Sequence, residues 1–160
     1  MEPDRHAIAQ ELFERAYRHQ MQGELDKAVD LYKDSIRACP TAEAYTFLGW
    51  TYRFQGKIDA AIEQCKFAIL IDPGFGNPYN DIGAYLIEKY DFDGAIPWLE
   101  KATRAPRYEA YHYAWYNLGR AYLGKDMYTM GRQCLEKSLE IEPRYDLARN
   151  ALSLLKKTIQ

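Results

Sequence analysis

Apolar residues recur along this chain at spacings of three and four, the period of a helix that buries one face. Two such stretches, residues 42–54 and 58–71, are separated by a short polar break, and Pro73 follows the second. Proline ends helices because it lacks an N–H group and clashes with the preceding turn. We therefore expect helices over both stretches. A third helix is expected to open with Asn77 as its N-cap and Pro78 at its first position.

A short motif on the first helix of each pair is repeated four times. Its strongest copy is Trp115-x-x-Leu118-Gly119-x-x-Tyr122. The four copies begin at Leu12, Tyr45, Tyr79 and Trp115, which are 33, 34 and 36 residues apart. A period in this range indicates stacked repeats instead of a single closed core.

A second half-motif follows each copy at a constant offset. Sixteen residues after each motif start there is a small residue: Ala28, Ala61, Ala95 and Gly131. Each repeat then closes on a proline: Pro40, Pro73, Pro106 and Pro143. Small residues at matched sites, such as Gly49 and Ala61, allow two helix backbones to approach closely where they cross.

These motifs resemble the tetratricopeptide repeat family, whose signature is W-x-x-L-G-x-x-Y, then A-x-x-x-F, then P. The resemblance implies an all-α, right-handed superhelical solenoid of helix-turn-helix repeats in a single domain spanning residues 1–160. The expected repeats are 9–41, 42–75, 76–111 and 112–145, followed by a C-terminal capping helix over about 146–158.

Departures from the repeat carry further expectations. Motif positions that are mostly apolar in later repeats hold Arg15 and His19 in the first one. This is expected of a terminal repeat, because the face that lacks a neighbouring repeat is exposed to water. With a polar first repeat and a capping helix, the chain is expected to be complete. The wider spacing before Trp115 is expected to lengthen the adjoining helix or the loop around residues 104–111.

Composition excludes several functional classes. The 160 residues are 48% hydrophobic and carry a net charge of −2, without the clustered basic excess of a nucleic-acid-binding protein. The N-terminus lacks the pattern of a signal peptide, and no apolar run reaches the roughly 18 residues of a membrane span. Three cysteines, without metal-ligand spacing, favour a reducing, cytoplasmic compartment.

In the tetratricopeptide repeat family, which the motifs resemble, the first helices of successive repeats line a concave groove that holds a partner peptide or helix. Here that face is rich in aromatic, amide and guanidinium groups, and aromatic residues and arginine carry much of the binding energy at interfaces. The candidates are Phe13, Tyr17, Gln20, Thr46, Trp50, Arg53, Phe54, Asn77, Asn80, Ala84, Ile87, Tyr113, Tyr116, Asn117, Arg120 and Leu123. The main contacts are expected from Trp50, Tyr116, Arg53 and Arg120. The alternative is that these aromatic rings pack against neighbouring repeats.

Other chemistry finds little support. Chaperone-binding family members hold a C-terminal carboxylate with lysine, arginine and asparagine, but the matching sites hold Phe13, Tyr17, Phe47, Asn77 and Asp81. Glu109-x-x-His112 is only half of a di-iron motif, Asp91-x-Asp93-Gly94 lacks the closing Glu of a calcium loop, and Gly74-Phe75-Gly76 lacks the Lys-Ser/Thr of a P-loop.

We therefore expect a scaffold or adaptor for a protein or peptide partner, with no catalytic, cofactor or metal site. Nucleic acid, membrane and a chaperone carboxylate are not expected partners. Self-association into a structural oligomer is the first alternative, and an enzyme is the second.

Overall fold

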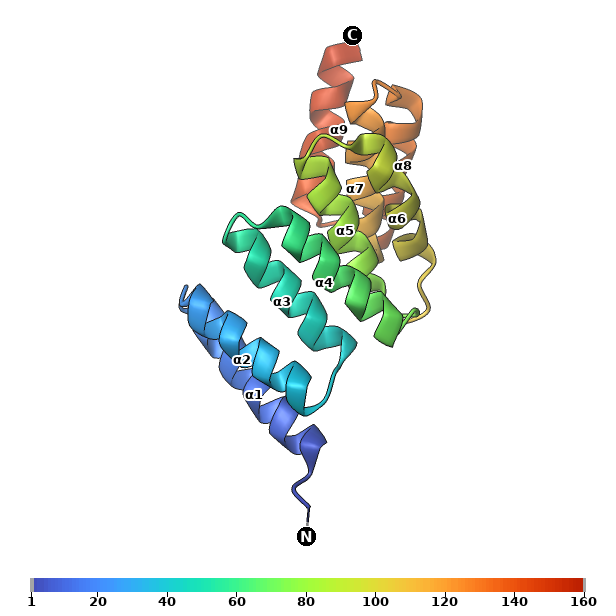
Figure 1. The fold of residues 1–160 in the computed structure, drawn as a ribbon. Coiled ribbons are helices and arrows are strands. Elements are labelled where there is room, and N and C mark those ends of the chain that lie inside the picture. The colour runs from blue at the N-terminus through green and yellow to red at the C-terminus, as the bar shows by residue number, and fades with distance from the viewer. Residues whose placement is uncertain (1, 160) are drawn as a thin grey trace. The chain divides into compact units, whose positions relative to one another are not determined.

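The computed structural model describes residues 2–159, and all regular elements in that range are α-helices except for an isolated β-bridge (Figure 1). They form four pairs and a final helix. Their bounds are α1 (Arg5–Met21), α2 (Leu25–Ala38), α3 (Ala42–Phe54), α4 (Ile58–Ile71), α5 (Gly76–Glu88), α6 (Phe92–Arg104), α7 (Tyr111–Gly124), α8 (Tyr128–Ile141) and α9 (Asp146–Ile159). The helices predicted over residues 42–54 and 58–71 are confirmed.

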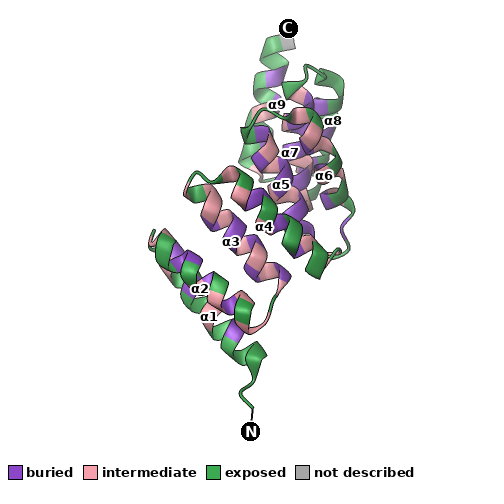
Figure 2. Ribbon diagram, viewed as in Figure 1, coloured by how far each residue is buried: buried purple, intermediate pink, exposed green. Residues whose placement is uncertain are grey.

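The helices belong to two compact units. Unit 1 ends at Pro73 and holds α1–α4, in which α1 packs on α2, α2 on α3, and α3 on α4. Unit 2 begins at Gly74 and holds α5–α9, in which each helix contacts the next and α5 also contacts α7. Within each unit the buried positions lie on helix sides that face other helices (Figure 2).

Small residues set the helix crossings, as the sequence predicts. A Cβ atom added to Gly49 would lie 2.9 Å from the backbone oxygen of Ala61, across the α3–α4 pair. One added to Gly119 would lie 3.1 Å from the backbone oxygen of Gly131, across the α7–α8 pair. In these two pairs the motif glycine therefore lets the helices approach to backbone contact.

Each unit is held by a buried core with a few internal hydrogen bonds. In unit 1 the core includes Val29, Tyr32 and Leu48, and the Tyr32 hydroxyl donates to Gln20 Oε1 at 2.6 Å. In unit 2, the buried residue Leu152 of α9 packs with α8. The final helix thus covers the end of the last pair.

Four connections within helix pairs use the same left-handed turn. The residue after the C-cap has positive φ in each case: 79° at Gly23 and Gly56, 60° at Tyr90 and 59° at Asp126. Glycine adopts this conformation at little cost, whereas an L side chain does so at a penalty. Unit 1 therefore uses the favourable residue at this site, and unit 2 does not.

The extra residues before Trp115 lengthen a loop and not a helix, because α6 ends at Arg104 and α7 begins at Tyr111. This loop pairs with the start of α5: the Gly76 N–H donates to the Arg107 carbonyl at 2.9 Å, and the Arg107 N–H donates to the Gly74 carbonyl at 3.0 Å. A side chain at position 76 would overlap Tyr108.

The predicted N-cap at Asn77 is wrong. Helix α5 already begins at Gly76, with Phe75 in the N-cap position and no side-chain cap. With the Gly76 N–H bonded to the Arg107 carbonyl, the helix starts two residues earlier than the local Asn-Pro pattern indicates. A contact across more than 30 residues therefore overrides the capping preference.

Candidate functional site

Five aromatic rings of α1 and α3 form a connected surface in unit 1. Phe47 lies at its centre, with ring centroids 5.2 Å from Phe13, 5.9 Å from Tyr17 and 5.8 Å from Trp50. Trp50 lies 5.1 Å from Phe54, and all four pairs meet edge to face. Tyr17 and Phe54 are 41% and 48% exposed, and the other three rings are half-buried. We call these five residues the unit 1 aromatic surface.

Phe47 was not among the predicted site residues, although a signal for it was present. Phe47, Trp50 and Phe54 follow one another at spacings of three and four, which places them on one helix face. Phe47 also contacts the buried Tyr32, so it joins the exposed rings to the core.

The remaining unit 1 candidates contribute less surface. Thr46 is buried, and its hydroxyl donates to the Ala42 carbonyl at 2.7 Å. Gln20 is buried against Tyr32. The guanidinium of half-buried Arg53 lies 5.2 Å from the Phe54 ring centroid, so Arg53 extends the unit 1 aromatic surface with a positive charge.

In unit 2 the candidates on α5 and α7 form a hydrogen-bonded chain. Asn117 Nδ2 donates to Asn80 Oδ1 at 3.0 Å, and Arg120 Nη1 donates to Asn117 Oδ1 at 3.0 Å. The Arg120 guanidinium lies 5.8 Å from the centroid of the Tyr116 ring. Asn117 is buried, and the other three are half-buried. These hydrogen bonds fix the orientation of the Asn80 and Asn117 amides and of the Arg120 guanidinium.

Tyr145, just before α9, gathers the rings of α7. The centroid of its ring lies 5.2 Å from the ring centroid of Tyr113, 5.3 Å from that of Tyr116 and 5.0 Å from that of His112. Burial, followed by Tyr116 and Tyr113, raises the pKa of the Tyr145 hydroxyl, which stays protonated at neutral pH. Tyr145 lies outside the first-helix register that supplied the candidates, so the repeat pattern could not have found it.

The other unit 2 candidates are dispersed. Ile87 is buried in the core, Ala84 is half-buried, and Leu123 packs against the cluster that includes Leu135. Exposed Asn77 lines a pocket of about 340 Å³. The rest of that pocket is formed by Phe75, Arg107, Tyr108, Glu109 and Ala110.

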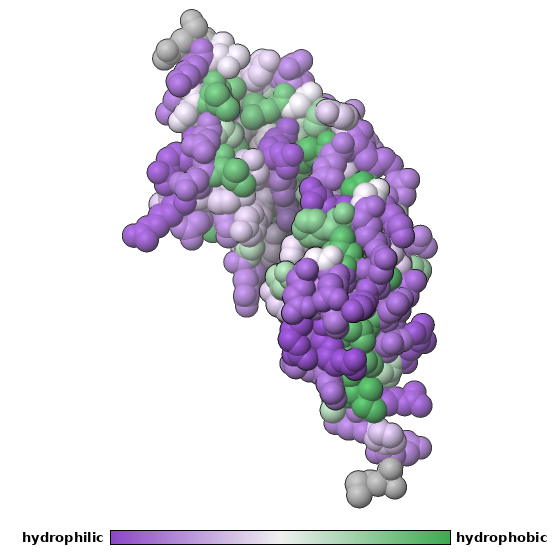
Figure 3. Space-filling view, turned by 90° about the vertical axis from the view of Figure 1, so that its left-hand side faces the viewer, coloured by the Kyte–Doolittle hydropathy of each residue, from purple (hydrophilic) through white to green (hydrophobic). Residues whose placement is uncertain are grey.

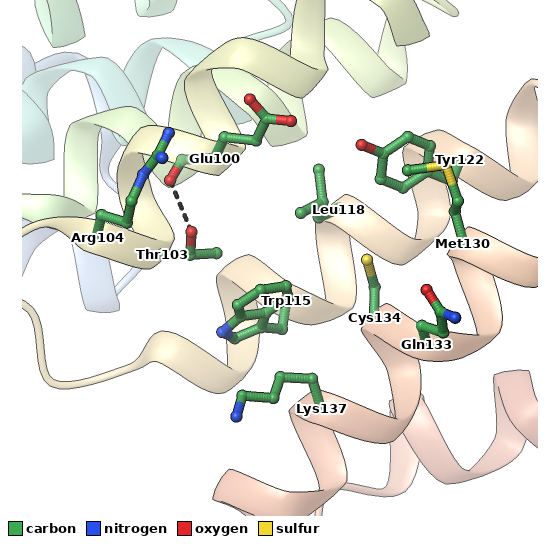
Figure 4. A pocket seen from close by; sticks show the side chains of 10 residues that line it. All are labelled: Glu100, Thr103, Arg104, Trp115, Leu118, Tyr122, Met130, Gln133, Cys134 and Lys137. Carbon is green, nitrogen blue, oxygen red and sulfur yellow. Dashed lines mark hydrogen bonds between the residues drawn. The ribbon is translucent and has the colours of Figure 1, made fainter.

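A larger pocket of about 690 Å³ lies among α6, α7 and α8 (Figure 4). Trp115, Leu118 and Tyr122 come from α7, and charged or polar side chains come from α6 and α8. Its lining residues are Glu100, Thr103, Arg104, Trp115, Leu118, Tyr122, Met130, Gln133, Cys134 and Lys137. Burial raises the pKa of the Cys134 thiol to about 11, so this group is protonated and a poor nucleophile at neutral pH.

The face of the molecule drawn in Figure 3 is mostly polar, with separate apolar patches. Within residues 2–159 no three His, Cys, Asp or Glu side chains are grouped so that they could hold a metal ion. None of the helices in this range combines the length and apolarity that a membrane span needs.

Comparison with known proteins identifies the repeat. A family model described as tetratricopeptide repeat matches residues 42–75 and 112–145. The BBSome complex member BBS4 of Bos taurus is 27% identical over 124 residues, which cover 77% of this chain but only 24% of that protein.

Solved structures show the same fold. MamA is 25% identical with a TM-score of 0.76, covering 89% of this chain and 83% of that one. Pseudomonas aeruginosa pilF has a TM-score of 0.90 at 18% identity, covering 96% of this chain and 70% of that one. Residues 42–75 and 112–145 are thus matched as tetratricopeptide repeats, and the paired helices of the chain have the fold of these solved structures.

Proposed function

We propose that this chain is an interaction scaffold that holds a segment of a partner protein on the first helices of its repeats. The observation that carries the proposal is the unit 1 aromatic surface, where exposed Phe54 adjoins half-buried Trp50 and exposed Tyr17 is joined to Trp50 through Phe47. Rings that are fixed by their neighbours bind with little loss of conformational entropy, and Trp and Tyr are frequent binding hot spots.

Unit 2 carries a candidate surface of its own, which offers directional contacts. Asn80 and Asn117 are already oriented by their mutual hydrogen bond, and Arg120 is held on Asn117. Their remaining donors and acceptors suit the backbone or polar side chains of a partner peptide or helix. Trp50 and Arg53 in unit 1, with Tyr116 and Arg120 in unit 2, are the proposed main contacts.

The relatives support a scaffold and not an enzyme. BBS4 is a member of a protein complex, and this chain matches about a quarter of its length. Tetratricopeptide repeats generally act as non-catalytic scaffolds. The free cysteines Cys39, Cys65 and Cys134 suit a reducing compartment, and we propose the cytoplasm.

Quantitative capture from a lysate of the source cells tests the proposal. Wild-type protein, a Trp50→Ala/Tyr116→Ala double variant and a Leu70→Ala control are immobilised at equal density. Leu70 is 77% exposed on α4 and lies outside the proposed surfaces. We expect a protein retained by wild type and by Leu70→Ala, and reduced at least tenfold on the double variant.

Melting temperatures and light scattering complete the test. Because Trp50 and Tyr116 are half-buried, the double variant should keep its helicity and lose only a few degrees of melting temperature. A large loss of stability would assign these rings to packing. If the mass of wild type instead grows with concentration and that of the double variant does not, the proposed surface binds a second copy of the chain.

A further inference from the structure

The aromatic residue that opens the repeat motif is covered by another ring in the second and third repeats. The ring centroids of Tyr45 on α3 and Phe67 on α4 lie 5.5 Å apart, and those of Tyr79 on α5 and Trp98 on α6 lie 6.2 Å apart. The two pairs have similar interplanar angles, 32° and 36°. In both repeats the second helix therefore supplies a ring that packs on the motif residue of the first helix.

Trp115 of α7 opens the fourth motif and lacks such a ring. Phe67 follows its motif start by 22 residues and Trp98 follows its own by 19, and the same offsets from Trp115 lead to Lys137 and Cys134 of α8. No described residue makes an aromatic ring contact with Trp115. One side of the indole packs on the unit 2 core, and the residue is half-buried. The fourth repeat thus keeps the motif ring without its cover.

The pocket of about 690 Å³ lies where the covering ring is missing. Trp115, Cys134 and Lys137 all line it, and the indole lies between side chains of α6 and side chains of α8 (Figure 4). Leu118 and Met130 add to its apolar lining. Its volume falls within the range of about 300–1,000 Å³ that is typical of ligand pockets. We call it the Trp115 pocket.

The charges around the Trp115 pocket favour an anion. Exposed Arg104, at the end of α6, forms no hydrogen bond or ion pair with any residue in the described range. Lys137 Nζ lies 3.3 Å from Glu140 Oε2 in a pair whose side chains are 49% and 68% exposed, and such surface pairs contribute little free energy. The carboxylate of Glu100 lies on the Tyr122 side of the pocket, away from the Arg104 guanidinium (Figure 4). Two cations are therefore available to an incoming carboxylate.

We propose that the Trp115 pocket binds an aromatic side chain of a partner protein that is adjacent to an aspartate or glutamate. The partner's ring packs on the indole as Phe67 and Trp98 pack on their motif residues, and ring pairs of this kind are favourable. The neighbouring carboxylate accepts charge-assisted hydrogen bonds from Arg104 and Lys137. This site goes beyond the proposed function, because it opens between α6 and α8, the second helices of their repeats.

Filling the pocket from within tests whether it has room for a ring. Lys137→Phe introduces the residue that the second repeat carries as Phe67, and the new ring pair with Trp115 should raise the melting temperature by about 2–4 °C. Lys156→Phe makes the same change at an exposed position on α9 and should alter the melting temperature by less than about 1 °C. A Lys137→Phe protein that melts at or below the temperature of wild type would overturn the inference.

Peptide selection tests the ligand. A library of random 12-residue peptides displayed on phage is first depleted on immobilised Lys137→Phe, and the remaining phage are selected on full-length wild type. We expect the selected peptides to share a phenylalanine, tyrosine or tryptophan next to an aspartate or glutamate. An empty selection, or selected peptides that share no aromatic residue, would overturn the Trp115 pocket.

A synthetic copy of a selected peptide tests the contacts. Its addition to wild type should shift the nuclear magnetic resonance signal of the Trp115 indole N–H. Its affinity should fall about fivefold for Arg104→Gln and stay unchanged for Arg15→Gln, which removes the same charge at an exposed position on α1. Equal affinities for wild type and Arg104→Gln, or for the peptide with its acidic residue changed to the amide, would overturn the inference.

Separate variants test this site and the proposed function. Trp50→Ala/Tyr116→Ala keeps every residue that lines the Trp115 pocket, and Lys137→Phe keeps the whole unit 1 aromatic surface. If the double variant loses the captured protein while no peptide requires the pocket, the Trp115 pocket falls and the scaffold function stands. If the double variant captures as much as wild type while the selected peptide binds, the scaffold surfaces fall and the pocket stands.

Discussion

Replacing Gly49 with alanine sets helix propensity against helix packing, and the two effects have opposite signs. In an exposed helix the change stabilises by about 1 kcal/mol, because glycine has more conformational freedom to lose. In unit 1, however, the new Cβ would lie 2.9 Å from the Ala61 backbone oxygen, 3.4 Å from Cys65 Sγ and 3.5 Å from Gln64 Cβ. The first distance is about half an ångström too short for a favourable contact.

The packing effect should exceed the propensity effect. A backbone oxygen cannot rotate away, so α3 and α4 must separate, and overpacking of this kind costs about 1–3 kcal/mol. We expect a net loss of about 1 kcal/mol and a melting temperature lower by about 2–4 °C for a chain of this length. Thermal and urea unfolding followed by far-ultraviolet circular dichroism measure both quantities.

Two further variants separate the contributions. Gly119→Ala meets its nearest backbone oxygen at 3.1 Å and should lose less stability than Gly49→Ala. Ser153→Ala, at an exposed position on α9, changes only propensity and should raise stability by a few tenths of a kcal/mol. A Gly49→Ala protein that melts above wild type would refute the view that this glycine is required by the helix crossing.

Two more predictions concern single side chains. Tyr90→Gly should stabilise the chain by about 0.5–1 kcal/mol, because Tyr90 is 82% exposed at φ 60°, where unit 1 uses glycine. A melting temperature below that of wild type would show that the ring contact between Tyr90 and Phe92 outweighs the backbone strain. Tyr32→Phe should cost about 1–3 kcal/mol in urea unfolding, because the buried Gln20 side chain, whose Nε2 already lacks a partner, would lose the hydrogen bond that its Oε1 accepts. Exposed Tyr113→Phe is its control, and equal losses in the two variants would contradict this account.

Local patterns predicted the helices of the second repeat to the residue. Both α3 and α4 end where the sequence supplies a break, and Thr41 Oγ1 accepts a hydrogen bond from the Ala44 N–H at the start of α3. The start of α5 escaped prediction, because it depends on Arg107 in a distant loop. The spacing of apolar residues predicts which residues share a helix face, but it does not predict which segments of the chain contact one another.

The same limit applies to the candidate surfaces. Counting around the helix from the repeat motif correctly placed Trp50 and Phe54 together, but it could not show that Thr46 is buried and bonded to its own helix. Tyr145 was missed as a site residue for a related reason: the rings that contact it lie on another element, α7.

The affinity of the captured partner for Trp50→Ala, measured by titration calorimetry beside Leu70→Ala, tests the central claim most directly. Hot-spot aromatic residues contribute about 2 kcal/mol or more. We therefore predict a dissociation constant at least tenfold higher for Trp50→Ala and unchanged for Leu70→Ala, with both proteins folded at the assay temperature. Equal dissociation constants for wild type, Trp50→Ala and Leu70→Ala would contradict partner binding by the unit 1 aromatic surface.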